Sequence, residues 1–173
     1  LLSSKLPSKI RNKKAIIIEA QAGQGKTTLV SQFINHNEFD FIWYQIGPED
    51  TDPVLLLSSL LANFNQKFSD FHSPKLATIL KDGVVGPLDL KQCANILLGD
   101  LNIYLQQDIF IVFDDLHLLS GSMLTNSLLE YMIDTSPPRL HFVLISRHPL
   151  EMKCKTFRDA NKISYLNTDD LAL

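Results

Sequence analysis

Residues that can bind phosphate are grouped near the start of the chain. The segment Ala-Gln-Ala-Gly-Gln-Gly-Lys-Thr-Thr (20–28) follows the apolar run at 15–18 and precedes a helix-like segment at 29–34. Glycines let backbone N–H groups converge on one anion, and a helix start adds positive potential. Lys26 can contact the β- and γ-phosphates and so assist catalysis, and the Thr27 hydroxyl can coordinate Mg²⁺. The predicted phosphate-binding residues are Ala22, Gly23, Gln24, Gly25, Lys26, Thr27 and Thr28.

This loop departs from the strict pattern at one position, where Ala20 stands in place of a glycine. The position needs a small residue, and alanine meets that need. The alternative interpretation is a glycine-containing turn that carries Gly-Lys-Thr by coincidence. The strand and helix expected on either side favour the phosphate-binding loop.

Two adjacent carboxylates follow an unbroken apolar run later in the chain. Ile-Phe-Ile-Val-Phe at 109–113 has the composition of a strand buried on both faces of a parallel sheet. Asp114 and Asp115 come next, at the edge where open α/β sheets bind ligands. Asp114 is predicted to hold Mg²⁺, directly or through water, and Asp115 to orient or deprotonate the attacking water. Taken alone, the pair also fits a solvated acidic turn.

A third polar pair follows another apolar run. Leu-His-Phe-Val-Leu-Ile at 140–145 predicts a buried strand, and Ser146 and Arg147 come directly after it. Arg147 is predicted to contact the γ-phosphate from the neighbouring strand and to act in catalysis. The alternative is a surface arginine in a loop.

Strand-like and helix-like segments alternate along the chain. Strands are expected at 15–20, 39–46, 109–113, 140–145 and 162–166. Helices are expected at 25–35, 75–81 and 123–134, from Pro53 after an Asp52 cap, and from an Asp89 cap to about Gln106. This alternation predicts a parallel sheet with right-handed crossovers.

The spacing of the motifs narrows the fold further. An additional strand and several helices separate Lys26 from Asp114, so their two strands are not consecutive. This favours the three-layer P-loop NTPase fold with about five parallel strands in the order 5-1-4-3-2 and helices on both faces. The guanine-reading Asn-Lys-x-Asp of GTPases does not occur in the chain.

Composition limits the classes of partner. The 173 residues suffice for one domain, and the net charge of −3 argues against direct DNA binding by this segment. No run approaches the ~18 apolar residues of a membrane span, so no membrane is expected as a partner. Cys93 and Cys154 lack the spacing of a metal site and fit reduced thiols in the cytoplasm.

Four motifs together resemble one known family. They are Glu-Ala-Gln-Ala-Gly-Gln-Gly-Lys-Thr-Thr-Leu-Val-Ser-Gln-Phe (19–33), Trp-Tyr (43–44), Phe-Asp-Asp-Leu-His-Leu-Leu (113–119) and Leu-Ile-Ser-Arg (144–147). This set is similar to the STAND class of signal-transduction ATPases, in the branch of LuxR-type transcriptional activators of the maltose-regulator kind. The resemblance extends from about residue 4 to residue 173.

The resemblance implies a cytoplasmic multidomain switch. It implies ATP or ADP and Mg²⁺ as cofactors, slow hydrolysis, other domains of the same protein as partners, and self-association in the ATP state. The expected division is a flanking segment at 1–14, a P-loop nucleotide-binding domain at 15–167, and the start of a helical lid domain at 168–173. The inducer and the output lie beyond what this segment specifies.

Two residues need separate interpretation. In the resembling family a histidine recurs at the place of His117, which implies a role in positioning water or phosphate. A lone histidine just past a strand also fits a packing or capping residue, and both interpretations stay open. Many members of the wider superfamily have Glu where this chain has Asp115. The shorter carboxylate holds water farther from the γ-phosphate, so slow hydrolysis is expected.

Two other functions remain as alternatives. The first is an AAA-type ring ATPase, in which an arginine is supplied to a neighbouring subunit; Arg158 is the candidate, and the Trp-Tyr and Asp-Asp-x-His motifs argue against it. The second is a degenerate scaffold that keeps the fold without binding nucleotide. Intact Lys26, Thr27 and Asp114 argue against the scaffold.

Overall fold

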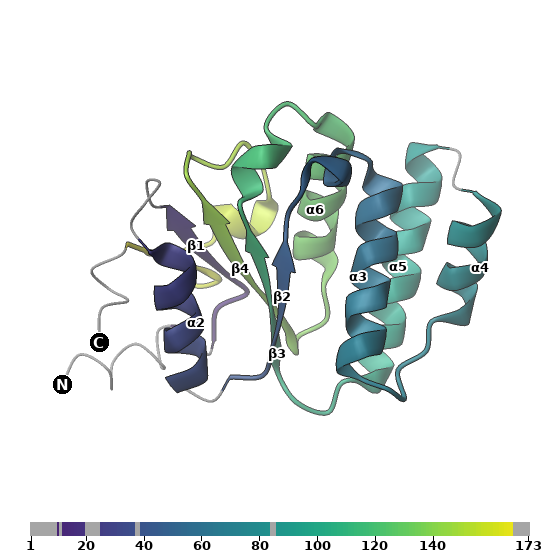
Figure 1. Ribbon diagram of the computed structural model, residues 1–173, viewed down its shortest axis with the longest axis horizontal. Helices are drawn as coiled ribbons and strands as arrows, with labels where there is room; N and C mark the ends of the chain where they lie inside the picture. Colours follow the sequence, from purple (N-terminus) through teal and green to yellow (C-terminus); the bar gives the residue numbers. More distant parts are fainter. Residues whose placement is uncertain (1–9, 11, 20–24, 37–38, 84–85, 168–173) are drawn as a thin grey trace.

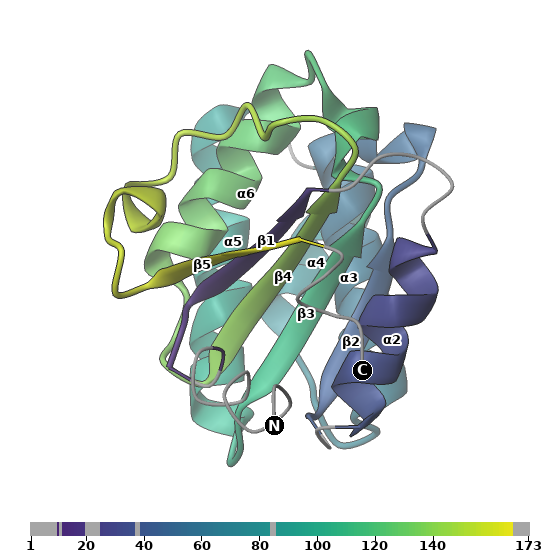
Figure 2. The same ribbon diagram turned by 90° about the vertical axis from the view of Figure 1, so that its left-hand side faces the viewer.

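The centre of the molecule is a parallel sheet of five strands. The computed structural model describes residues 10, 12–19, 25–36, 39–83 and 86–167. The strands are β1 (Ala15–Glu19), β2 (Phe41–Gln45), β3 (Ile109–Asp114), β4 (Leu140–Ser146) and β5 (Ile163–Leu166). They are arranged in the order β2-β3-β4-β1-β5, and every adjacent pair is parallel (Figures 1 and 2). The predicted fold class and the predicted order 5-1-4-3-2 are confirmed.

Helices cover both faces of this sheet. They are α2 (Lys26–His36), α3 (Pro53–Lys67), α4 (Pro74–Asp82), α5 (Pro87–Tyr104) and α6 (Met123–Thr135). Helix α2 lies on one face, whereas α3, α5 and α6 lie on the other and α4 packs outside α5 (Figures 1 and 2). Three short 3₁₀ helices, η1 (Pro48–Thr51), η2 (Leu116–Leu119) and η3 (Lys155–Arg158), lie in the connections.

The alternation of side chains along the strands creates two separate cores. In β1, Ala15 and Ile17 point into the core on the α3–α6 side, whereas Ile16 and Ile18 point toward α2. Successive residues of a strand face opposite sides of the sheet, so a strand that is apolar throughout fills both cores. This explains the unbroken apolar runs in the sequence.

Local signals set the helix starts, with one correction. Asp52 caps α3 as expected, because its side chain accepts a hydrogen bond of 2.9 Å from the Val54 N–H. Asp89 was expected to cap α5, but that prediction is wrong: α5 begins at Pro87, and the Asp89 carboxylate accepts the Gly86 N–H at 3.1 Å from within the first turn. Proline at the first helical position has the required backbone angle, and an acidic residue two positions later can bond back to the cap.

Candidate functional site

Three neighbouring strands bring polar residues to one edge of the sheet. Gln45 ends β2, Asp114 ends β3, and Ser146 ends β4. Because the strands are parallel and adjacent, their carboxyl ends meet at the same edge, which is where open α/β sheets bind ligands. The pairing of Gln45 with Asp114 in the β2–β3 register places these two residues side by side.

Asp114 is a carboxylate withdrawn from water. Its exposed fraction is only 3 %, and its main-chain carbonyl accepts the Ile46 N–H at 3.0 Å. Buried carboxylates in proteins are paired, hydrogen-bonded or bound to a cation. The position and chemistry of Asp114 therefore fit a role at a Mg²⁺ site.

Asp115 has an unusual backbone conformation. Its φ of 61° and ψ of 42° lie in the left-handed region, and it is the one non-glycine residue with positive φ in the described part of the chain. Aspartate tolerates this region better than most residues, and such conformations concentrate at functional sites. The turn breaks the strand immediately after Asp114, so two consecutive carboxylates occupy different environments: Asp114 is buried, and the Asp115 side chain is 32 % exposed.

Gln45 holds the Asp115 carboxylate. Its Nε2 donates a hydrogen bond of 2.8 Å to Oδ2 of Asp115, and His117 Nδ1 lies 4.0 Å from Oδ1. Sequence reasoning did not single out Gln45. The available signal was a polar residue that ends an apolar strand next to the aspartate strand.

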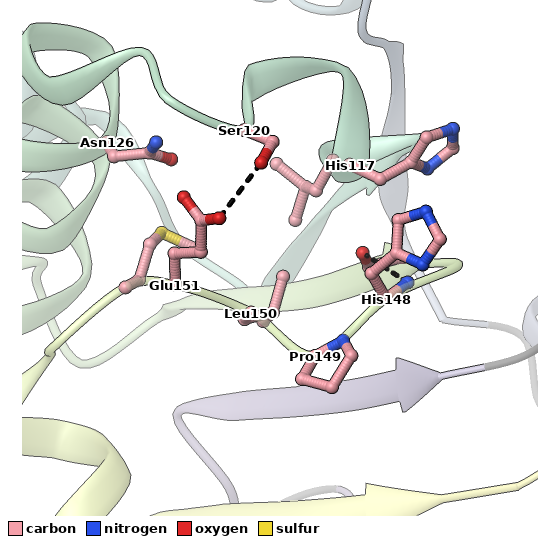
Figure 3. Close-up of a pocket in the computed structure, with 10 residues that line it drawn as sticks. His117, Ser120, Asn126, His148, Pro149, Leu150 and Glu151 are labelled. Atoms are coloured by element: carbon pink, nitrogen blue, oxygen red, sulfur yellow. Dashed lines mark hydrogen bonds between the residues drawn. The ribbon is translucent and has the colours of Figure 1, made fainter.

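The polar pair after β4 separates into a buried and an exposed residue. Ser146 is 2 % exposed and its Oγ accepts the His148 N–H at 3.2 Å. The Arg147 side chain is exposed. The His148 ring meets the His117 ring edge-on, with 5.8 Å between centroids, across a small pocket between the loops that follow β3 and β4 (Figure 3). Arg147 therefore follows the strand next to the one that ends at Asp114. Its contact with phosphate stays a prediction.

The structure describes only some of the residues that were predicted to bind phosphate. Ala22, Gly23 and Gln24 lie outside the described residues, as do the side chains of Lys26 and Thr27. Gly25 has φ of +64°, a conformation that favours glycine, and α2 begins immediately after it at Lys26. The side chain of Thr28 is exposed. The connection from the end of β1 to the start of α2 matches the strand–loop–helix order that such loops require.

The donors near the end of β3 determine whether Mg²⁺ and a nucleotide fit there. Within the described ranges, no group of three or more His, Cys, Asp or Glu side chains gathers as a metal cage. Mg²⁺ is commonly held by one or two carboxylates together with substrate phosphates and water. The buried Asp114 carboxylate fits this manner of binding, with Thr27 as the second predicted protein ligand.

Comparison with known proteins decides the family. A family model described as an AAA domain matches residues 10–152. The chain belongs to the AAA domain family. The transcriptional regulator MalT of Klebsiella pneumoniae, described as HTH-type, is 23% identical over 161 residues, and that of Serratia proteamaculans is 26% identical over 164 residues. Each match covers 93% of this chain and 17% of the relative, so the chain spans about a sixth of these regulators. The resemblance to maltose-regulator activators is therefore confirmed.

This AAA domain has a fold similar to that of chains in solved structures of the Drosophila ORC. A chain from "Structure of Drosophila ORC bound to DNA" superposes with a TM-score of 0.57 at 11% identity, covering 96% of this chain and 86% of that one. A chain from "Structure of Drosophila ORC bound to AT-rich DNA and Cdc6" gives 0.56 at 11% identity, covering 96% and 55%. At this identity the likeness concerns the fold alone. It supports the parallel α/β fold, whereas membership of the AAA domain family rests on the family model.

The Trp-Tyr motif of this AAA domain supports the turn beside the site. Tyr44 points into the larger core and its hydroxyl donates a 2.6 Å hydrogen bond to Oδ1 of buried Asp50, whose Oδ2 accepts the Gly47 N–H at 2.8 Å. Burial and this hydrogen bond raise the pKa of Tyr44 above its ordinary value. Trp43 packs on the opposite face, toward α2. The motif therefore builds the framework, with one residue for each face of the sheet.

Among the helices in the described ranges, none combines the length and apolar character needed to cross a bilayer.

Proposed function

We propose that this AAA domain is an ATP/ADP-binding switch module of a multidomain cytoplasmic regulator of signal transduction or transcription, with slow Mg²⁺-dependent ATP hydrolysis. One observation carries the proposal. At the end of β3, beside β4, the buried Asp114 is followed directly by Asp115, whose backbone lies in the left-handed region. In P-loop NTPases an aspartate helps to hold Mg²⁺ and a further residue positions the attacking water, and this pair would supply both groups beside the Gly-Lys-Thr sequence.

The residues would divide the work as follows. Lys26 and the backbone N–H groups of residues 22–28 would bind the phosphates, and Thr27 and Asp114 would hold Mg²⁺, which would neutralise phosphate charge. Asp115, accessible to solvent and oriented by Gln45, would position or deprotonate the attacking water. Arg147 would contact the γ-phosphate.

Slow turnover is expected from the same geometry. Aspartate is one methylene shorter than glutamate, and the hydrogen bond from Gln45 restrains its reach. A hydrolysis rate that is slow relative to signalling leaves the ATP-bound state populated long enough to act. Similarity to the MalT transcriptional regulators supports a regulatory rather than a metabolic use. The proposal includes other domains of the same protein as partners and self-association in the ATP state.

Calorimetric titration with ATP and with ADP, each with and without Mg²⁺, tests the proposal. Lys26→Ala should weaken nucleotide binding at least about 100-fold, because a cation facing the β- and γ-phosphates is lost. Lys75→Ala, at an exposed position in the first turn of α4, removes the same charge elsewhere and should leave affinity unchanged. Asp114→Asn, which keeps the volume of the buried side chain, should abolish the dependence of ATP affinity on Mg²⁺. Undiminished ATP binding by Lys26→Ala would contradict the phosphate-binding assignment.

A further inference from the structure

The segment after β4 is fastened to α6 by carboxylates. We call residues 147–156 the strap. Glu130 Oε1 accepts the Lys153 N–H at 2.8 Å, and Asp134 accepts the Lys155 N–H at 3.0 Å and the Thr156 N–H at 2.9 Å. Glu130 and Asp134 are four residues apart on α6, so they lie on one side of the helix. The strap, which has no strand or α-helix of its own, therefore runs alongside α6 (Figure 2).

Glu151 makes the opposite connection, from the strap to the turn before α6. Its Oε1 accepts the Ser120 hydroxyl at 2.9 Å, and its Oε2 accepts the Gly121 N–H at 3.3 Å (Figure 3). One carboxylate thus binds two donors from consecutive residues. Gly121 has φ of +80°, a backbone conformation that favours glycine.

These contacts join the two loops that carry the proposed catalytic residues. The loop after β3 contains Asp115, and the loop after β4 contains Arg147. The β3–β4 ladder ends with the pairing of Phe113 and Leu144, so sheet hydrogen bonds do not hold the loops themselves. Beyond the ladder, the described contacts between the loops include the Glu151 hydrogen bonds and the His117–His148 ring contact, beside apolar packing of Leu116 and Met152 in the larger core.

We propose that Glu151 is a positioning residue for ATP hydrolysis, which holds the Arg147 loop against the Asp115 loop. The inference rests on the proposed function. Hydrolysis depends on the relative placement of the water-directing and phosphate-contacting groups, and a shift of about 1 Å can cost up to 100-fold in rate. Ground-state binding depends mainly on the phosphate-binding loop and Mg²⁺, which Glu151 does not contact in the described residues.

Steady-state ATP hydrolysis, ATP binding and hydrogen exchange, measured on the same variants, test this inference. Glu151→Ala should lower kcat about tenfold and leave KM and ATP affinity within about twofold. Hydrogen exchange at the Gly121 amide should accelerate about tenfold, and that at Lys153 should not. Glu151→Gln keeps a carbonyl oxygen that accepts one of the two hydrogen bonds, and should recover part of kcat.

Glu130→Ala is the matched control. It removes a glutamate that also joins the strap to α6, through the Lys153 N–H, but lies away from the Ser120–Gly121 turn. It should accelerate exchange at Lys153 and leave kcat within about twofold of the wild type.

The outcomes separate this inference from the function on which it rests. Failure of the wild-type chain to bind ATP would contradict the proposed function. With ATP binding intact, a wild-type kcat in Glu151→Ala would overturn only the role of Glu151. An equal loss of kcat in Glu130→Ala would overturn it too, because the effect would then reflect the strap as a whole.

Discussion

The two faces of the sheet are covered very differently. On one face, α3, α4, α5 and α6 build a large core that includes Leu57, Leu60 and Phe64, all fully buried. On the other face, within the described residues, α2 lies over a smaller core that also includes Ile10, and Trp43 remains only partly buried there (Figures 1 and 2). Both cores are built from the same strands, so the difference comes from the helices.

The two halves of the proposed site, the carboxylates after β3 and the predicted phosphate-binding residues that begin α2, therefore lie on faces of the sheet that differ in how much core covers them. The loop after β3, which carries Asp115 and which we call the carboxylate loop, leads into α6, and the strap is fastened to that helix. Both therefore belong to the α3–α6 side of the sheet, which we call the thick layer; the α2 side is the thin layer. Lys26 begins α2, the helix of the thin layer. Local opening requires less free energy where fewer buried contacts are lost. We therefore expect α2 to move more readily than the carboxylate loop when nucleotide is exchanged.

Truncating one phenylalanine in each layer should show the largest effect. Phe64→Ala, in α3, removes a side chain with 0 % exposure that packs against Phe71, and should lower the free energy of unfolding by about 4 kcal/mol. Phe33→Ala, in α2, removes a side chain with 6 % exposure and should cost about 3 kcal/mol or less, because this layer can relax. Urea denaturation measures both. A greater loss from Phe33→Ala would contradict the comparison.

Removing one charge should test the carboxylate loop without disturbing its layer. Asp115→Asn should slow ATP hydrolysis at least about 100-fold, equivalent to about 2.7 kcal/mol of activation free energy, because the water-directing carboxylate is lost. Unfolding should not change, because asparagine tolerates the left-handed conformation and retains an acceptor for Gln45. Single-turnover hydrolysis and thermal unfolding measure the two effects, and unaltered hydrolysis would exclude Asp115 from the chemistry.

A smaller change in the free energy of unfolding is expected when the hydrogen bond between Tyr44 and Asp50, which supports the turn after β2, is removed. Tyr44→Phe removes the hydroxyl that donates to the buried carboxylate of Asp50, and should destabilise the fold by about 1 to 2 kcal/mol. Tyr165→Phe, at a position that is 64% exposed on β5, is the control and should change stability by less than about 0.5 kcal/mol. Equal denaturation midpoints for the two variants would show that the buried hydrogen bond contributes no net stability.

The smallest effect concerns pH and the start of β1. Lys14 Nζ donates to the carbonyls of Pro137 at 2.8 Å and Leu140 at 2.6 Å, which ties β1 to the turn after α6. Burial, followed by the charge of Lys162, lowers the pKa of Lys14 from 10.5 to about 8. Between these two pKa values the unfolded chain binds more protons than the folded chain, so this group makes stability rise with pH from about 8 toward 10.5.

Lys14→Met isolates this contribution. The rise should be about 1 kcal/mol after allowance for partial solvent screening, and it should disappear in the variant. Urea denaturation of both proteins across this pH range measures it. The same slope in Lys14→Met would assign the pH dependence to other groups.

Local patterns predicted most of the framework correctly. The five strands, their order and the cap at Asp52 follow from signals within a few residues or from the order of motifs along the chain. The start of α5 was predicted wrongly at Asp89, because Pro87, two residues earlier, was the stronger signal for a helix start. Gln45 and Glu151 were not found, because their partners lie 70 and 31 residues away and only folding brings them together.

Residue type and order along the chain were enough to specify a parallel α/β domain with phosphate-binding and carboxylate motifs at one edge, because strand periodicity and motif spacing are local properties. The tertiary structure decided the rest: which face is thick, how Asp114 and Asp115 divide between buried and exposed surroundings, and that Glu151 joins two loops. These features depend on packing and on side-chain hydrogen bonds between distant segments, which acquire their geometry only when the sheet and its helices have assembled.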